Sequence, residues 1–103
     1  MADSYKIGQE CAADGTGTLL RITGELDITA RGDLHEAIMA ALDSGDVIVD
    51  LAAVTFIDSE ALGALIDGYN EARSRSTGFR VVNANGVVAR VLSVSGALDL
   101  FGP

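Results

Sequence analysis

The sequence predicts an α/β fold in which a mixed sheet, with a parallel core and an N-terminal hairpin, is packed by amphipathic helices. Strand-like segments alternate with helical patterns of roughly a dozen residues, which is typical of parallel strands joined by right-handed crossovers. Near the N-terminus, two strand-like segments are separated only by a glycine-containing turn. No internal repeat or low-complexity segment interrupts the order strand, strand, helix, strand, helix, strand, helix.

The two N-terminal strands are predicted to form the hairpin. Tyr5 to Cys11 alternates weakly between apolar and polar residues, and Thr18 to Thr23 reads TLLRIT. Residues 12–17 between them contain two glycines and an aspartate, which are typical of a turn. The segment Gly24 to Asp27, with the sequence GELD, is expected to break the second strand.

A first helix and a central strand are predicted after this break. The helix is indicated by apolar residues at intervals of three and four, and Gly45 lies just past them, as at many helix C-termini. Val47 to Leu51 is almost continuously apolar, which fits a parallel strand covered on both faces. The apolar stripe of the helix comprises Ala30, Leu34, Ala37, Ile38, Ala41 and Leu42.

The second helix has the clearest pattern in the chain. Arg73 and Arg75 lie near its end, where cations favour the helix dipole, and Gly78 ends it. Phe79 to Asn83 is predicted as a strand, the valine-rich residues 87–94 as a short helix, and Leu98 to Phe101 as either a last strand or a packed tail. The stripe of the second helix comprises Leu62, Leu65, Ile66, Tyr69 and Ala72.

Composition limits the possible function classes. With 103 residues the chain is expected to form one domain, residues 1–103. Its 15 acidic and 7 basic residues give a net charge of −8, which argues against nucleic-acid binding and favours a protein partner with a basic patch. The single Cys11 leaves no disulfide or cysteine metal site, and no basic leader or long apolar run is present. We therefore expect a cytoplasmic protein without direct membrane insertion.

The inventory of catalytic groups is small. His35 is the only histidine, and the sequence contains no GxSxG, P-loop, CxxC or HExxH motif. The sequence therefore predicts a protein that is not an enzyme and needs no cofactor or metal. A small enzyme with an acidic metal-binding loop stays open as an alternative, although the spacing of its candidate ligands specifies no geometry. These candidates are Asp27, Asp50, Asp58 and Glu60.

The most informative feature is Asp58-Ser59, where an apolar run ends and a segment with helical spacing of its apolar residues begins. A serine there lies at a helix N-terminus, where unpaired backbone N–H groups and the helix dipole favour negative charge, including a phosphate. The same residue types are also preferred as N-caps for structural reasons alone. Residues 58 and 59 are therefore predicted either as a cap or as a phosphate-bearing site.

Two motifs extend this observation over nearly the whole chain. Arg21 to Asp27, RITGELD, precedes the first helix, and Val54 to Ser59, VTFIDS, precedes Leu62-Gly63. Together with Val49-Asp50-Leu51 they resemble the bacterial anti-sigma factor antagonists of the STAS domain family. The resemblance implies a single STAS-type domain that binds an anti-sigma factor serine kinase. This binding frees a sigma factor for transcription, for example in a stress response, until phosphorylation ends it and a serine phosphatase restores it.

The resemblance also implies site residues. By position Ser59 is the phosphorylated serine of a partner-switching phosphoprotein, and Asp27 lies beside it. Relatives commonly follow this serine with a second small hydroxyl residue and a glycine, whereas this chain has Glu60 and Ala61. A STAS subunit of a transporter or larger signalling complex, without phospho-switching, is the second hypothesis, and we expect a monomer or weak dimer. The expected partner-binding residues are Asp27, Thr55, Ile57, Asp58, Ser59, Glu60 and Leu62, the last of which fits the core equally well.

Overall fold

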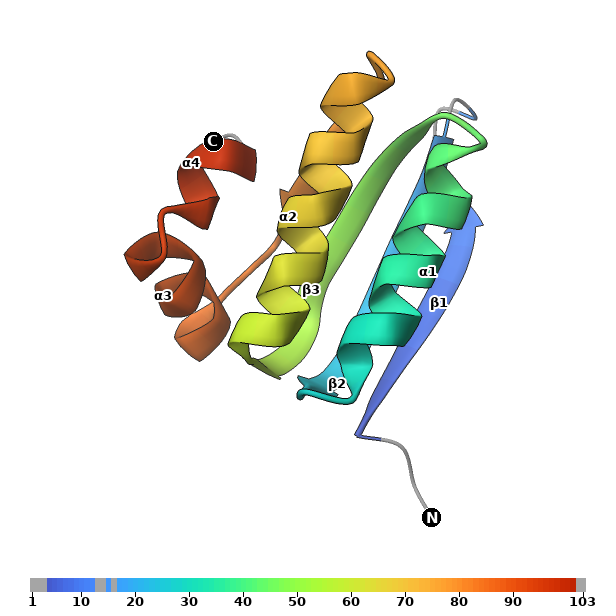
Figure 1. The fold of residues 1–103 in the computed structure, drawn as a ribbon. Coiled ribbons are helices and arrows are strands. Elements are labelled where there is room, and N and C mark those ends of the chain that lie inside the picture. The colour runs from blue at the N-terminus through green and yellow to red at the C-terminus, as the bar shows by residue number, and fades with distance from the viewer. Residues whose placement is uncertain (1–3, 13–14, 16, 102–103) are drawn as a thin grey trace.

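The computed structural model describes residues 4–12, 15 and 17–101. In these ranges, strands and helices alternate between an initial pair of strands and a final pair of helices (Figure 1). The elements are β1 (Tyr5–Cys11), β2 (Gly17–Leu26), α1 (Ala30–Leu42), β3 (Asp46–Ile57), α2 (Ser59–Ser74), β4 (Phe79–Val82), α3 (Gly86–Val94) and α4 (Ala97–Phe101). None of the helices in the described ranges is long and apolar enough to cross a membrane.

The strands form one sheet of order β1-β2-β3-β4. β1 pairs antiparallel with β2, while β2, β3 and β4 run parallel, so the predicted hairpin and parallel core are confirmed. The predicted turn at residues 12–17 lies partly outside the described residues. Helices α1 and α2 lie side by side over one face of the sheet, and α3 and α4 lie on the other side of α2 (Figure 1).

The core is built from aliphatic side chains between the sheet and the helices. Leu34 and Ile38 of α1 and Leu65 of α2 are fully buried, as the periodicity predicts. The prediction that the central strand is covered on both faces was wrong. Val47, Val49 and Leu51 are buried, but Ile48 and Asp50, which lie between them, are only half-buried. The reason is that α1 and α2 pack against only one face of the sheet, and the side chains of Ile48 and Asp50 point to the other face.

Three boundaries differ from the prediction. β2 does not break at Gly24, because Gly24 takes a φ of +96° at a shift of register and pairing with β3 then resumes. β3 does not end at Leu51 but runs on to Ile57, since that pairing satisfies its backbone. Leu98 to Phe101 is not a strand but part of the short helix α4. It packs as expected, because the Phe101 ring contacts the rings of Tyr69 and Phe79.

Candidate functional site

The C-terminal ends of β2 and β3 bring the two sequence motifs together. Leu26 is the register partner of Ile57, the last pair between these strands. The backbone N–H of Asp58 then donates to the carbonyl of Leu26 at 3.0 Å. Residues 27 and 58 therefore leave the sheet from adjoining positions, so the GELD segment and the start of α2 form one surface.

Asp58 caps α2, so the hydroxyl of Ser59 is not needed as the capping group. Asp58 has extended backbone angles, φ −98° and ψ 176°, and its carboxylate accepts a hydrogen bond from the Ala61 N–H at 2.9 Å. Ser59 is the first helical residue and is exposed. Its hydroxyl makes no hydrogen bond to any other part of the chain that the structure describes. The capping role thus falls to Asp58 alone, and the fold does not use the Ser59 hydroxyl.

Two substitutions of Asp58 distinguish the contribution of its capping hydrogen bond from that of its negative charge. Asp58→Ala is expected to lower the free energy of unfolding by about 1 kcal/mol, because the Ala61 N–H loses its acceptor. Asp58→Asn keeps an acceptor oxygen and removes the charge, so its stability should stay within a few tenths of a kcal/mol of wild type. Urea denaturation of the three proteins measures both values. Equal stability of Asp58→Ala and wild type would contradict the cap.

Asp27 orders the turn that leads into α1. Its carboxylate accepts hydrogen bonds from the Thr29 hydroxyl and from the Thr29 N–H, the latter at 3.0 Å. These bonds, chiefly that from the hydroxyl, lower the pKa of Asp27 below its ordinary value. Because a lowered pKa favours the charged form, Asp27 carries a full negative charge at neutral pH.

Glu60 is held in an ion pair with α1. Its Oε1 lies 2.9 Å from Nη1 of Arg31, whose Nη2 also lies 3.8 Å from Oδ2 of Asp67 on α2. Pairs this exposed contribute at most about 1 kcal/mol of stability, but they orient the charge. The acidic group that follows Ser59 in the sequence therefore points toward α1. Ala61, the residue that follows Glu60, is fully buried.

The remaining expected contacts divide between surface and core. Thr55 is exposed, and its hydroxyl donates to the Gly24 carbonyl at 3.4 Å. Ile57 is 2% exposed, so its assignment as a partner contact was wrong. Val54 and Ile57 are both buried and the two residues between them are exposed, because the pairing of β2 with β3 is irregular here. Leu62 is 8% exposed and belongs mainly to the core.

Two exposed apolar residues near the C-terminal ends of β2 and β3 were missed by the sequence analysis. Ile28, in the turn beside Asp27, is 67% exposed, and Phe56, on the last part of β3, is 42% exposed. Ile28 lies outside the apolar stripe of the first helix, a signal that could have identified it. No such signal existed for Phe56, because the sequence does not reveal on which face it lies.

The acidic residues do not converge on a metal site. Within residues 4–12, 15 and 17–101, no group of three or more histidine, cysteine or acidic side chains could hold a metal ion. Asp50 pairs with Arg21 across the sheet and accepts hydrogen bonds from the Ala52 N–H and from Asn83. It precedes Ile57 by seven residues, about 20 Å along a strand that rises roughly 3.3 Å per residue.

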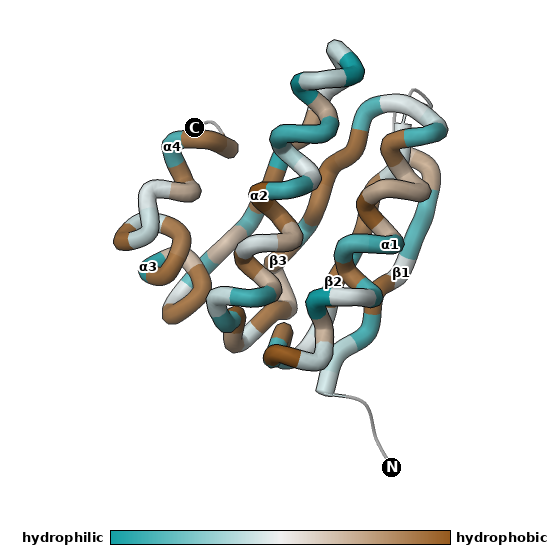
Figure 2. Tube along the Cα trace, viewed as in Figure 1, coloured by the Kyte–Doolittle hydropathy of each residue, from teal (hydrophilic) through white to brown (hydrophobic). Residues whose placement is uncertain are grey.

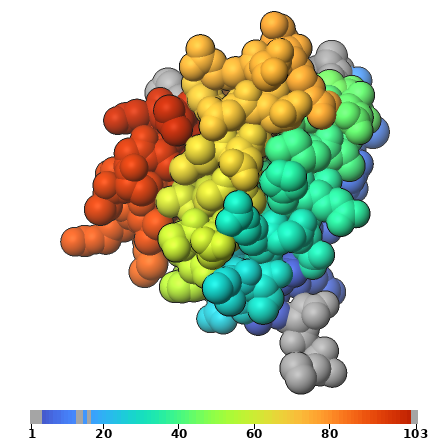
Figure 3. All heavy atoms as spheres, viewed as in Figure 1, coloured from blue at the N-terminus to red at the C-terminus, as the bar shows by residue number. Residues whose placement is uncertain are grey.

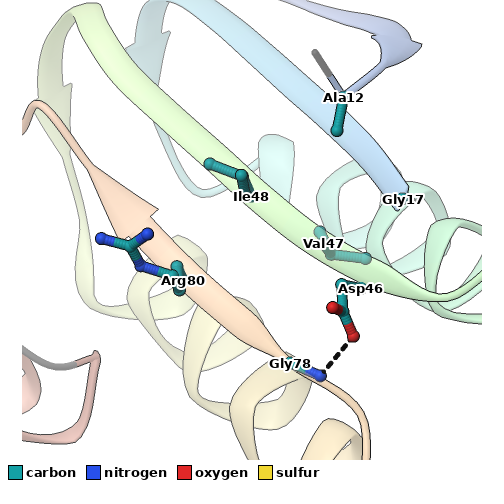
Figure 4. A pocket seen from close by; sticks show the side chains of 7 residues that line it. All are labelled: Ala12, Gly17, Asp46, Val47, Ile48, Gly78 and Arg80. Atoms are coloured by element: carbon teal, nitrogen blue, oxygen red, sulfur yellow. Dashed lines mark hydrogen bonds between the residues drawn. The ribbon is translucent and has the colours of Figure 1, made fainter. Parts of the chain in front are cut away.

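A cavity of about 190 Å³ at the opposite edge of the sheet has a structural explanation (Figure 4). Asp46, at the start of β3, accepts hydrogen bonds from the Gly78 N–H at 2.8 Å and the Thr77 hydroxyl at 2.7 Å. These bonds fasten the turn before β4 to the start of β3. Arg80 is the one cation that lines the cavity, together with Ala12, Gly17, Asp46, Val47, Ile48 and Gly78. This pocket is distant from the ends of β2 and β3 that carry residues 27 and 59.

Comparisons with known proteins agree with this arrangement. A family model described as "Mlab, STAS domain" matches residues 10–101. A STAS-domain containing protein of Pseudomonas aeruginosa is 30% identical over 91 residues, covering 87% of this chain and 90% of that protein. The crystal structure of an anti-sigma factor antagonist from Mycobacterium paratuberculosis has a TM-score of 0.84 and 26% identity, over 96% of this chain and 84% of that one.

Two forms of a further protein share the fold. The anti-sigma factor antagonist SpoIIAA in its unphosphorylated form has a TM-score of 0.76 and 21% identity, over 88% of this chain and 81% of that one. The Bacillus cell fate determinant SpoIIAA in its phosphorylated form has a TM-score of 0.71 and 20% identity, over 88% and 84%. At this identity the likeness extends to the fold alone.

Proposed function

The chain belongs to the STAS domain family, and we propose that it is an anti-sigma factor antagonist whose binding is switched by phosphorylation of Ser59. The unmodified protein binds an anti-sigma factor serine kinase in the cytoplasm and so releases a sigma factor. Phosphorylation by that kinase ends the interaction, and a serine phosphatase reverses the modification. The observation that carries the proposal is the exposed Ser59 hydroxyl, which the fold leaves unused beside the turn of Asp27.

The surroundings of Ser59 suit a reversible charge switch. A phosphate adds about −1.5 to −2 charges at neutral pH, and the N-terminus of α2 favours such a charge. Phosphorylation should therefore leave the helix intact. The new charge follows Asp58 directly in the sequence and adds to an already acidic protein, so a partner fitted to a neutral serine must bury a strongly hydrated anion. The affinity falls at the interface itself, without any rearrangement of the fold.

The proposed binding surface is continuous. Figure 3 shows the yellow-green N-terminal part of α2 between the cyan residues that lead into α1 and the orange residues of α3. We assign to this surface the polar residues Asp27, Thr55, Asp58, Ser59 and Glu60. The exposed apolar side chains of Ile28 and Phe56 extend it and give a partner surface to desolvate.

The experiment uses the purified GHKL-type serine kinases encoded in the source genome as probes. Ser59→Ala is expected to bind the cognate kinase within about twofold of wild type, because it removes only a hydroxyl. Ser59→Asp should bind at least about tenfold more weakly, a difference of about 1.4 kcal/mol, because it adds a charge that must be desolvated. Isothermal titration calorimetry gives the affinities, and mass spectrometry after incubation with ATP locates the phosphate.

Ser44→Asp is the matched control. Ser44 is also exposed, but it follows α1 at the opposite edge of the sheet, so the same added charge should leave the affinity unchanged. Phosphate on a residue other than Ser59 would contradict the proposal, as would equal binding by Ser59→Asp and wild type.

A second candidate function is a STAS subunit of a transporter or larger signalling complex without phospho-switching. The observation that favours it is Glu60, which directly follows Ser59 in the sequence, where the relatives commonly have a small hydroxyl residue, and which is held by Arg31. Tight binding to a transporter ATPase, with no phosphate incorporated by any of the kinases, would support this function over the first.

A further inference from the structure

A groove of about 380 Å³ lies between the first turns of α2 and the outer side of α3. Ser59 and Leu62 contribute one wall from α2, and Val91 and Val94 contribute the other from α3. Arg90 and Ser95 complete the lining. The Ser59 hydroxyl therefore stands at the edge of a mainly aliphatic groove, on the side of α2 opposite to the Arg31–Glu60 pair.

Helix α3 carries a second apolar stripe, of which the two ends are exposed. Val88 and Leu92 are fully buried and attach the helix to the domain. Val87, Val91 and Val94 follow a separate i, i+4, i+7 spacing, and Val87 and Val94 are 59% and 80% exposed. Figure 2 shows α3 as brown along most of its length. Contiguous aliphatic surface of this kind is typical of a site of protein interaction.

Arg90 has no ion-pair partner within the described ranges of the chain. Arg21, Arg31 and Arg75 each pair with at least one carboxylate, whereas, within these same ranges, Arg73, Arg80 and Arg90 do not; of these three, only Arg90 lines the groove. Arg90 thus places an unpaired guanidinium beside an aliphatic groove on a protein of net charge −8. It presents a positive charge that a carboxylate of a bound partner would complement.

The geometry points to this groove as the binding site for an amphipathic segment of the anti-sigma factor partner. An aliphatic side chain of that segment packs between Leu62 and Val94, and a neighbouring carboxylate pairs with Arg90. This inference rests on the proposed function and extends the binding surface from the acidic turns to α3. It also gives phosphorylation a second effect: a phosphate on Ser59, which lines the same groove, competes with the partner carboxylate for Arg90.

The test measures the affinity of the cognate serine kinase for two variants of α3. Val94→Asp places a charge in the aliphatic wall, and Arg90→Glu reverses the charge that meets the partner. Each is expected to weaken binding at least about tenfold. Leu100→Asp and Arg80→Glu are matched controls, since Leu100 is 41% exposed on α4 and Arg80 is exposed on β4. Both controls should bind within about twofold of wild type, and thermal unfolding checks that all four variants fold.

A charge swap identifies the ion pair. One acidic residue of the kinase, changed to arginine, should restore binding to Arg90→Glu while weakening binding to wild type.

If Ser59→Asp weakens binding but Val94→Asp and Arg90→Glu bind like wild type, the groove is not the contact. The inference is then overturned, while the proposed function stands. If Val94→Asp abolishes a self-association seen by sedimentation velocity and leaves the kinase affinity unchanged, the groove binds a second copy of this chain. The inference is then again overturned. If no kinase binds or phosphorylates wild type, the proposed function itself has failed.

Discussion

Replacing Leu65 by alanine is expected to lower the free energy of unfolding by about 2 to 5 kcal/mol. Leu65 is fully buried on the face of α2 that packs against the core. The loss combines the transfer free energy of the deleted methyl groups with the cost of the cavity that remains. Urea denaturation followed by circular dichroism measures the change, and a value under about 1 kcal/mol would show that this core is loosely packed.

Asn70→Ala is the control on the same helix. Asn70 is exposed, so its replacement removes no core contact. Because alanine has the higher helix propensity, the variant should be as stable as wild type or more stable by a few tenths of a kcal/mol. A comparable loss in both variants would indicate a general weakness of α2 rather than a cavity at Leu65.

Replacing Gly24 by alanine is the second change with a large expected effect, about 2 to 4 kcal/mol of destabilisation. Gly24 has a φ of +96°, a conformation that residues with a Cβ rarely adopt. A Cβ there would lie 2.2 Å from the carbonyl oxygen of Ser4 and 3.0 Å from the Cα of Tyr5. These are backbone atoms, so β1 must shift to relieve the overlap. The same Ser4 oxygen accepts the Glu25 N–H at 2.7 Å, so the shift also disturbs the approach to Asp27.

Gly8→Ala in β1 tests whether the effect is specific. Its Cβ would lie 3.5 Å from the Arg21 carbonyl oxygen, an ordinary contact. This variant should be as stable as wild type or slightly more stable, because alanine loses less conformational entropy on folding. Denaturation midpoints that are equal for Gly24→Ala and Gly8→Ala would contradict the strained bulge at Gly24.

The sequence was sufficient to predict the local elements and the placement of the serine. Apolar periodicity identified both long helices, and the pattern around Asp58 and Ser59 identified a helix start, because caps depend on residues close in sequence. The end of the second strand was missed, since pairing with β3 overrides the tendency of Gly24 to interrupt a strand. Likewise, Ile57 was misassigned because its burial follows from an irregular pairing of β2 with β3, which no local pattern indicates.

Long-range features of the candidate site could not be predicted from the sequence. The pairing of Arg31 with Glu60 joins residues 29 positions apart on two helices, and no local pattern indicates it. The run of valines in α3 suggested a single apolar helix. Only the packed structure divides it into a buried face with Val88 and an outer face with Val94. Side-chain roles that depend on two elements thus require the fold.

The hydrogen bond from the Asp58 N–H to the Leu26 carbonyl has a kinetic consequence. It continues the ladder between β2 and β3 to the point where both loops depart, so their relative position is set when the sheet forms. A partner then meets a surface that is already ordered, and association loses little conformational entropy. Encounter becomes limited by diffusion, orientation and charge rather than by loop ordering. In the proposed switch, a phosphate on this surface shortens the lifetime of the complex, because the partner must bury a strongly hydrated anion.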